Sequence, residues 1–346
     1  MNVKNKLSFA YRLGLKGYAF CPQAIQYTAI FVRYTERKGG AFCMQIQKIT
    51  IIGMGALGTL YGTHLLDEGE EVQYVLDESR FQKYAGTLFY KNQKPYHLPM
   101  VNAKQAQPAD LLIVAVKYPG LPSALDTMAS SVGEGTIIMS VMNGIDSEDI
   151  LAERFGKEHL IYTVAHKMDA IRFGNKLTFK HEGELCIGAK EECQKQNVRD
   201  VQEFLERTHI AYQVDDHILH RLWSKFMVND GLNQVSMVYD TNYDGLLSKG
   251  EPNRTMVAAM REVIAVAQAE GIDLGETDLN EYMDVMEHLD PQGYPSMRQD
   301  ALAKRTCEVE MFSGIVLKLA AKHHLYVPTN EFLYDRIHEI ESTYLS

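Results

Sequence analysis

Hydrophobic residues in the first two thirds of the chain occur in short runs separated by polar turns. Strands are predicted for the runs at about 49–52, 72–76, 111–116, 136–142, 160–165 and 185–187. Helical spacing follows the first run, through Tyr61, Leu65 and Leu66, and returns at 123–131. Strands that alternate with helices predict a parallel sheet covered by helices on both faces.

The strand pattern stops near Val214, and long helical periods replace it. Helices are expected at about 217–238, 253–270, 278–288, 297–323 and 329–343. Ser296 and Gln299 have capping-box spacing at the start of the fourth of these helices. The predicted fold class is therefore α/β, with a sheet domain over residues 44–214 and an all-helical domain over residues 215–346.

A glycine-rich turn joins the first predicted strand to the first helix: Gly53-Met54-Gly55-Ala56-Leu57-Gly58. In a G-x-G-x-x-G turn the first glycine permits the tight turn, the second lets a pyrophosphate approach, and the third lets helix and strand pack closely. Such a turn also occurs where glycine is needed for backbone reasons alone. Its place between strand and helix, with Asp77 about 24 residues after Gly53, favours a Rossmann-type dinucleotide site.

Asp77, at the end of the second strand, leaves the choice of dinucleotide open. An acid here usually binds the ribose 2′-hydroxyl and selects NAD, but Arg80 could bind a 2′-phosphate and select NADP. A surface pair between the two residues is the simpler alternative. Lys117 and Asn143 also follow predicted strands, at the sheet edge where ligands bind in open α/β sheets, or they only lead the chain into solvent-exposed loops.

A polar line crosses the helix predicted at 217–238. At about 100° per residue, Lys225, Asn229 and Asn233 fall on one narrow line, with apolar residues on both sides. Buried polar groups need partners, and a polar substrate is one candidate, while internal hydrogen bonds or water are the alternative. Glu308, within the predicted helix 297–323, and Ser296, at its start, are further candidates, with a solvated face and an N-cap as the simpler interpretations.

Composition and charge narrow the possible partners. The 346 residues are 46% hydrophobic and carry a formal charge of −10. Most of the surface should therefore repel nucleic acid and anionic membranes, and small molecules or other proteins are the expected partners. Five scattered cysteines without C-x-x-C, and histidines without metal-ligand spacing, favour a reducing cytoplasm and no bound metal. Residues 1–43 have a net charge of +6 and no secretory-signal pattern, and are expected to be an N-terminal extension of the fold. The simplest explanation is an upstream start codon before Met44, and a transit peptide or a regulatory arm is the alternative.

From Met44 onward these motifs together resemble the ketopantoate reductase family (2-dehydropantoate 2-reductases). The resemblance rests on five motifs in the family's order: the glycine turn, Val116-Lys117, Asn143-Gly144, Lys225 with Asn229 and Asn233, and Ser296 through Glu308. It implies a Rossmann domain, a helical domain, and NADPH-dependent reduction of ketopantoate, in pantothenate biosynthesis. A homodimer is a further expectation from the family.

The resemblance also implies residue roles. Lys225 matches the general acid, and Glu308 a residue that contacts the cofactor and orients the active site. Asn229, Asn233 and Ser296 match positions that bind substrate, while Asn143 lies near the nicotinamide and Lys117 near the cofactor. Members that prefer NADPH commonly have a basic residue where this chain has Asp77, so NAD(H) is an alternative cofactor.

Two further departures concern the substrate and the glutamate motif. No counterpart of the family's third substrate-binding asparagine is identified around Asn242-Tyr243, and Cys307 replaces a threonine that often precedes the glutamate. Another branched 2-keto or 2-hydroxy acid is therefore an alternative substrate. A protein that senses NADP(H) without turnover is the alternative from a different functional class.

Overall fold

A computed structural model describes residues 34–36 and 42–345. The chain divides into two units, residues 1–46 and residues 47–346. In the first unit, β1 (Tyr34–Glu36) and β2 (Phe42–Met44) form an antiparallel hairpin with Thr35 opposite Cys43. Most of the predicted N-terminal extension, residues 1–33 and 37–41, lies outside the described residues.

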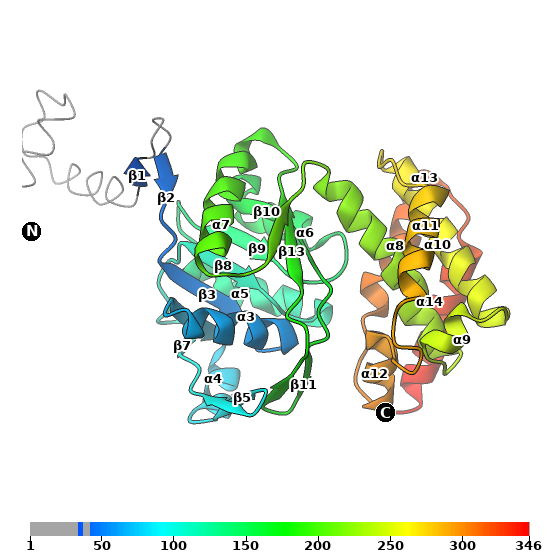
Figure 1. The fold of residues 1–346 in the computed structure, drawn as a ribbon, viewed down its shortest axis with the longest axis horizontal. Helices are drawn as coiled ribbons and strands as arrows, with labels where there is room; N and C mark the ends of the chain where they lie inside the picture. The colour runs from blue at the N-terminus through cyan, green and yellow to red at the C-terminus, as the bar shows by residue number, and fades with distance from the viewer. Residues whose placement is uncertain (1–33, 37–41, 346) are drawn as a thin grey trace, which may run out of the picture. The chain divides into compact units, whose positions relative to one another are not determined.

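The second unit begins with an eight-stranded sheet (Figure 1). Its strands, in spatial order, are β14 (Tyr212–Val214), β13 (Glu184–Gly188), β10 (Leu160–His166), β9 (Ile137–Ser140), β8 (Leu111–Val114), β3 (Lys48–Ile52), β4 (Glu71–Leu76) and β7 (Met100–Asn102). All neighbours pair in parallel except β10 and β13, which are antiparallel. The central strands β8 and β9 are buried along their whole length, as expected for strands covered on both faces.

Helices cover both faces of this sheet. They are α3 (Ala56–Asp67), α4 (Glu78–Tyr84), α5 (Leu121–Met128), α6 (Ser147–Phe155) and α7 (Lys195–Arg207), with short 3₁₀ turns at Tyr118–Gly120, Ala129–Ser131, Lys157–His159 and Glu192–Gln194. Leu121, Ala124 and Met128 of α5 share a core cluster with Leu151 of α6. On another side, α3 meets the end of α7, where the His64 ring bonds the Thr208 carbonyl.

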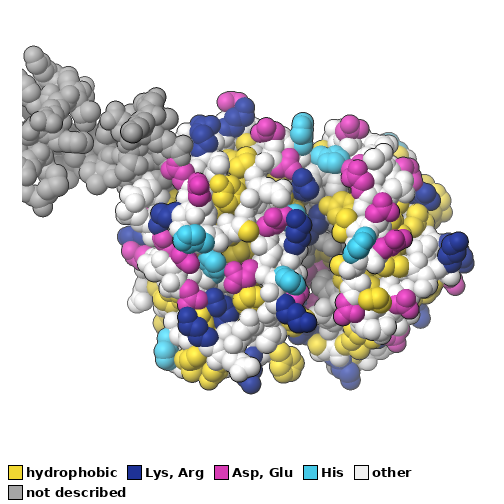
Figure 2. All heavy atoms as spheres, in the orientation of Figure 1, with side chains coloured by type: hydrophobic (Ala, Val, Ile, Leu, Met, Phe, Trp, Pro, Cys, Tyr) yellow, Lys and Arg dark blue, Asp and Glu magenta, His cyan; other side chains and the backbone are white. Residues whose placement is uncertain are grey.

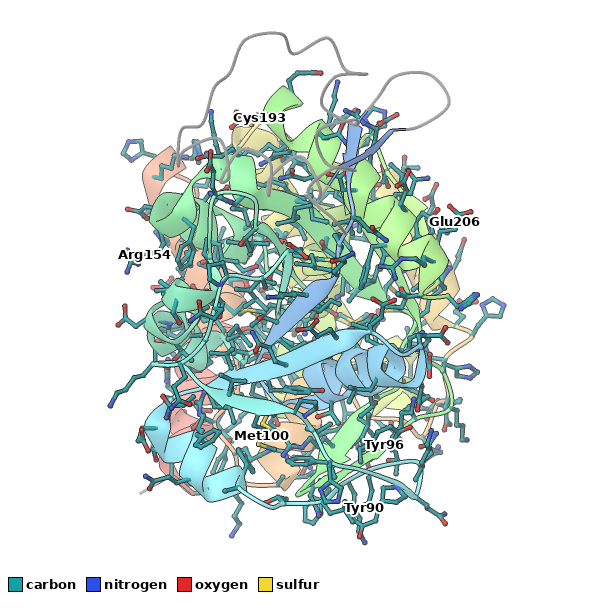
Figure 3. The ribbon with its side chains drawn as sticks, turned by 90° about the vertical axis from the view of Figure 1, so that its left-hand side faces the viewer. Tyr90, Tyr96, Met100, Arg154, Cys193 and Glu206 are labelled. Carbon is teal, nitrogen blue, oxygen red and sulfur yellow. The ribbon has the colours of Figure 1, made fainter. Side chains whose placement is uncertain are left out.

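A second, smaller sheet has four short strands: β5 (Phe89–Lys91), β6 (Lys94–Tyr96), β11 (Ile171–Phe173) and β12 (Lys176–Thr178). The pairing of β5 with β12 joins segments that lie more than eighty residues apart. Figure 3 shows Tyr90 and Tyr96 of this sheet at the opposite end of the view from Cys193. The sequence pattern did not predict this sheet, because three-residue strands carry too little periodicity to be detected.

The helical part contains α8 (Ile218–Val238), α9 (Tyr243–Leu247), α10 (Glu251–Ala269), α11 (Glu276–Met286), α12 (Ser296–Leu302), α13 (Ser313–His323) and α14 (Pro328–Ser342). The long helix α8 is buried on most of its surface and contacts both β10 and the other helices. Phe226 of α8 packs against Trp223 and Phe312. Among the described residues, no helix is both long and apolar enough to cross a membrane.

The predicted fold class is confirmed: a sheet domain dominated by parallel pairs is followed by a helical part (Figure 1). The predicted domain limits, 44–214 and 215–346, stay predictions, because residues 47–346 form one compact unit. Figure 2 shows a furrow on one face between the sheet part and the helical part, with several lysine and arginine side chains along it.

The single helix predicted at 297–323 is wrong. The chain forms α12, a 3₁₀ turn at Val309–Met311, and then α13. Residues 302–306 are all exposed, and Lys304 has a left-handed backbone with φ of 51°, where the Arg305 amide bonds back to the Asp300 carbonyl and ends α12. Glu308 consequently lies just before the 3₁₀ turn and not within a helix, so the solvated helix face considered for it does not exist.

Candidate active site

The glycine turn connects β3 to α3 with a geometry that only glycine fits. Gly53 has φ of +107°, and a Cβ there would lie 2.5 Å from the Ala115 carbonyl oxygen. A Cβ on Gly58 would lie 2.1 Å from the Gly53 carbonyl oxygen. The first and third glycines therefore hold the turn against the end of β8 and the start of α3, as the motif predicts.

The same turn fits a bound pyrophosphate. Gly55 is the N-cap of α3 and has no side chain to occupy the first amide groups of that helix. A Cβ on Gly55 would meet only the Ala115 carbonyl oxygen, at 3.6 Å, so the space in front of the turn is open to a ligand. Met54 is buried, while Ala56 and Leu57 begin the helix with partly exposed side chains. A helix N-terminus with free amide groups favours an anion.

Asp77 caps a helix in this structure. Its carboxylate accepts the backbone N–H of Arg80 at 2.9 Å, and the Arg80 guanidinium lies 3.5 Å from the other carboxylate oxygen. Both side chains are substantially exposed. The simpler alternative considered for this pair, a surface contact, is therefore present, and both groups also remain accessible from solvent at the end of β4.

Lys225 reaches from α8 to the sheet. Its ammonium donates to Asn143 Oδ1 at 2.9 Å and to the Ala165 carbonyl oxygen at 2.6 Å. Ala165 belongs to β10, and Asn143 lies in the segment that follows the neighbouring strand β9. An ammonium has three N–H donors, and these contacts use two of them, which leaves one for a further acceptor.

The surroundings of Lys225 lower its proton affinity. Desolvation lowers the pKa of the Lys225 ammonium to about 8, against the opposing effect of the Glu148 and Glu308 carboxylates. A positioned acid transfers protons best when its pKa is near the working pH. The ammonium at the sheet edge is therefore suited to donate a proton near neutral pH.

Asn229 and Asn233 of the polar line lie together with Ser296, which the sequence indicates as a separate candidate. The Asn233 amide donates to the Asn229 carbonyl at 3.0 Å, and its oxygen accepts the Ser296 hydroxyl at 2.8 Å and the Met297 N–H at 3.3 Å. The side chain of Asn229 makes no hydrogen bond to any residue that the structure describes. Internal hydrogen bonds thus satisfy Asn233 and Ser296 in this state.

The prediction of a capping box at Ser296 and Gln299 is wrong. Pro295 is the N-cap of α12, and Ser296 is the first helical residue. The Gln299 amide donates to the Tyr294 carbonyl instead of returning to a serine N-cap. The Ser296 hydroxyl is consequently directed to Asn233 on α8, which the sequence spacing could not indicate.

Lys117 and Glu308 join the sheet part to the helical part. The Lys117 ammonium lies 2.7 Å from Asp300 Oδ2, and Glu308 Oε1 accepts the Tyr118 N–H at 3.0 Å. Burial raises the pKa of Glu308, while the Tyr118 amide and the Lys117 and Lys225 charges oppose that shift. Glu308 is therefore close enough to both Lys117 and Lys225 to interact with their charges.

Sequence reasoning missed several residues of this site. Asp300, 8% exposed, pairs with both Lys117 and Arg305. Its place one helical turn after Ser296 was a signal that could have been used. Ala165 was not identifiable, because it contributes only a backbone carbonyl. Glu148, a buried acid five residues after Asn143, was also overlooked.

Comparisons with known proteins agree with this fold. The family model "Ketopantoate reductase PanE/ApbA" matches residues 49–192, and "Ketopantoate reductase PanE/ApbA C terminal" matches residues 217–341. The 2-dehydropantoate 2-reductase of Shigella flexneri is 28% identical over 302 residues, covering 86% of this chain and 96% of that protein.

Two solved structures show the same fold. D-mandelate dehydrogenase with NADH and anilino(oxo)acetate has a TM-score of 0.77 at 23% identity, over 86% of this chain and 99% of that one. The dimeric ketopantoate reductase of Staphylococcus aureus has a TM-score of 0.70 at 18% identity, over 86% and 99%. Because the two family models together match well over half of the sequence, the chain belongs to the ketopantoate reductase family, whose members are nicotinamide-dependent oxidoreductases.

Proposed function

We propose that the chain reduces 2-dehydropantoate (ketopantoate) to pantoate with NADPH, and that Lys225 is the general acid. The observation that carries the proposal is the Lys225 ammonium, which bonds Asn143 and Ala165 at the sheet edge and has a pKa near 8. Its remaining N–H can bind the ketone oxygen of a 2-keto acid. This reaction would place the chain in pantothenate biosynthesis, in the cytoplasm.

The protein supplies orientation and charge stabilisation. A bound nicotinamide supplies the hydride that adds to the ketone carbon. The Lys225 ammonium polarises the ketone beforehand and gives its proton to the oxygen, so that a hydroxyl group forms and a neutral amine remains. The contacts to Asn143 and Ala165 fix the Nζ atom during this transfer.

The substrate-binding role belongs to Asn229, Asn233 and Ser296. Asn229 has a partly exposed side chain one helical turn from Lys225, so its amide can bind a hydroxyl or carboxylate oxygen of the substrate. The Ser296 hydroxyl and the Asn233 amide already bond each other, so a carboxylate can be held by the pair only after their hydrogen bond is rearranged.

The cofactor would be held by the turn from Gly53 to Gly58, with Asn143 near the nicotinamide and Lys117 near the cofactor. Glu308 would contact the cofactor and orient the active site. Its bond to the Tyr118 amide supports this role, because it ties the segment after α12 to the segment after β8. NADPH requires that Arg80 leave Asp77 and bind the 2′-phosphate, whereas NADH could use Asp77 directly. Both side chains are exposed, so each is accessible to the ribose end of a bound cofactor.

A reductase for another branched or aromatic 2-keto acid is the second candidate. Asn242 lies where the family's third substrate-binding asparagine would be sought. It caps α9 by accepting the Gly245 N–H at 3.1 Å. Its side chain is therefore already used locally. The fold shared with D-mandelate dehydrogenase adds support for substrates other than 2-dehydropantoate. A homodimer is a further proposal, supported by the dimeric relative.

The test is oxidation of the reduced nicotinamide, followed by absorbance, with 2-dehydropantoate and a panel of aliphatic and aromatic 2-keto acids. NADPH and NADH are used in parallel. The proposal predicts the highest kcat/KM for 2-dehydropantoate with NADPH. A higher value for another acid, or for NADH, would support the second candidate or the Asp77 arrangement. Tight cofactor binding without turnover of any acid would contradict catalysis and favour a sensing role.

A further inference from the structure

Glu148 is a buried acid that the proposed reaction does not use. It belongs to the first turn of α6, and only 2% of its surface is exposed. Its carboxylate accepts the Ser147 hydroxyl at 2.8 Å, and that hydroxyl in turn lies 2.9 Å from the Ser140 hydroxyl. All three side chains are buried, so these hydrogen bonds fix the carboxylate close to the end of β9.

Glu148 connects two strand ends that separate from each other. The pairing of β9 with β10 reaches Met139 and Ile161, and β9 ends at Ser140. Beyond that point the backbone amide of Thr163, on β10, lies close enough to the Glu148 carboxylate to favour its charged form and so oppose the rise in its pKa. Glu148 therefore continues the contact between the segment after β9 and strand β10, where the strands themselves no longer pair.

Lys225 bonds the same two parts of the chain, the segment after β9 and strand β10. Asn143 follows the end of β9, and Ala165 lies two residues after Thr163, so the two acceptors of the ammonium belong to the segments that Glu148 links. No hydrogen bond joins Glu148 to Lys225 directly among the described residues. Glu148 nevertheless exerts the largest electrostatic stabilisation on the ammonium, ahead of Glu308.

We propose that Glu148 is a positioning residue for Lys225: through Ser147 and Ser140 its buried carboxylate closes the segment that carries Asn143, an acceptor of the Lys225 ammonium, and it supplies the negative charge that favours the protonated amine. This inference rests on the proposed function for its catalytic consequence, but the interaction itself can be measured without turnover. A neutral side chain at position 148 should therefore lower the pKa of Lys225.

The other charged groups near this pair do not replace Glu148. Glu308 reaches Lys225 from the segment after α12, and His166 on β10 lies close enough for Lys225 to lower its pKa. The negative charge of the neighbouring Asp149 adds to the rise in the pKa of Glu148. Burial, the dominant effect, raises the pKa of Glu148 to about 7, so its charge is present in the range where Lys225 titrates.

The primary test is Glu148→Gln in the full chain, with the pKa of Lys225 measured from the pH dependence of its acetylation rate by peptide mass spectrometry. Loss of a nearby opposite charge should lower that pKa by about 1 unit. Glu148→Asp keeps a carboxylate, so the pKa of Lys225 in this variant should stay close to its value in the unsubstituted chain. Glu153→Gln, an exposed acid on the same helix, is the matched control and should change nothing.

The kinetic readout separates this inference from the proposed function. In Glu148→Gln, the alkaline limb of the kcat profile should move to lower pH by the same amount as the Lys225 pKa. An unchanged Lys225 pKa in Glu148→Gln, or equal shifts in the Gln and Asp variants, would overturn the role of Glu148. Full turnover in Lys225→Ala would overturn the proposed function instead and leave the acetylation result interpretable.

A reciprocal experiment covers a Glu148→Gln protein that does not fold. Because coupling between two sites is reciprocal, Lys225→Met should raise the pKa of Glu148 by about as much as Glu148 raises that of Lys225. Infrared titration of the carboxyl that ionises near pH 7 measures this shift. A midpoint unchanged from that of the unsubstituted chain would contradict the inference.

Discussion

Lys225 combines two properties that seldom occur in one lysine: its ammonium is held at a fixed place, and desolvation lowers its pKa to about 8. A lysine in water has a pKa of about 10.4 and donates its proton less readily than Lys225 would. The helix around it is buried on most sides, which both fixes and desolvates the amine. The chemistry proposed here depends on that environment as much as on the residue.

The kcat for reduction should depend on pH through Lys225. The general acid must be protonated, so kcat should stay level below pH 7 and fall about tenfold per unit well above the Lys225 pKa of about 8. Oxidation of the hydroxy acid needs the neutral amine, so the kcat for that direction should rise as the pH increases through the Lys225 pKa. Steady-state rates with saturating substrates from about pH 6 to about pH 10 measure both. A reduction rate that stays level to the end of this range would contradict the assignment.

Asp230 on α8 should make the fold less stable as the pH rises. The side chain is fully buried, and burial raises its pKa well above the usual value, with Glu262 adding to the effect. The folded state therefore keeps a proton that the unfolded chain loses above about pH 4, so the free energy of unfolding falls as pH increases toward the folded pKa.

Asp230→Asn should remove this loss. Asparagine keeps an oxygen for the Gln234 amide, which now donates to Asp230 at 2.8 Å. We expect the variant to gain about 1–3 kcal/mol over the natural chain at pH 8 and little at pH 5, as measured by urea unfolding. Asp273→Asn, an exposed acid, is the control. An equal effect of the two substitutions at pH 8 would disprove the role of burial.

At the scale of elements, the turn between β3 and α3 was predictable because its constraint is local. A side chain at Gly53 would collide with Ala115, next to β8, and one at Gly58 would collide with Gly53. The spacing of the glycines in the sequence therefore predicts the turn. The helices α8, α10 and α14 were likewise predicted within about two residues of their observed ends, because their apolar periods are long.

Other elements depend on contacts that the sequence does not display. The break after α12 is accompanied by pairing of Arg305 with Asp300 and a bond from the Cys307 amide to Glu341, 34 residues away. The Ser296 hydroxyl bonds Asn233 because α12 packs on α8. The candidate site could be assembled from motifs, but its hydrogen bonds, and the parts played by Asp300 and Glu148, required the fold.

Gly58→Ala tests the glycine turn. The added Cβ would lie 2.1 Å from the Gly53 carbonyl, so the turn must shift away from the position that a pyrophosphate needs. We expect at least about a tenfold rise in the Kd for NADPH, or about 1.4 kcal/mol of binding, measured by fluorescence titration. Gly275→Ala, where a Cβ meets nothing within 4 Å, is the matched control. Unchanged affinity in Gly58→Ala would show that the turn does not carry the cofactor.

At the scale of the whole molecule, the candidate site lies where the sheet meets the helices. Three sets of contacts join the two parts: Lys225 with Asn143 and Ala165, Lys117 with Asp300, and Glu308 with the Tyr118 amide. Each includes a residue that the family resemblance assigned to catalysis or to cofactor binding. Substrate, cofactor and the arrangement of the two parts are therefore expected to influence one another.

Residues 47–346 form a compact unit separate from residues 1–46. A chain that begins at Met44 should therefore fold as well as the full chain, with a Tm within about 2 °C and the same kcat and KM. Differential scanning calorimetry and the steady-state assay measure these values. A much lower Tm, or loss of turnover, would show that the N-terminal residues contribute to the fold or to the site.

The central claim is that Lys225 is the proton donor for reduction of a 2-keto acid. The most direct measurement is kcat for the best substrate of the panel in Lys225→Ala, together with the Kd for NADPH. We predict a kcat lower by about 10²- to 10⁴-fold and a Kd within about twofold of the unsubstituted value, because the residue acts on the substrate oxygen. Unchanged turnover in this variant, with the cofactor bound, would contradict the account.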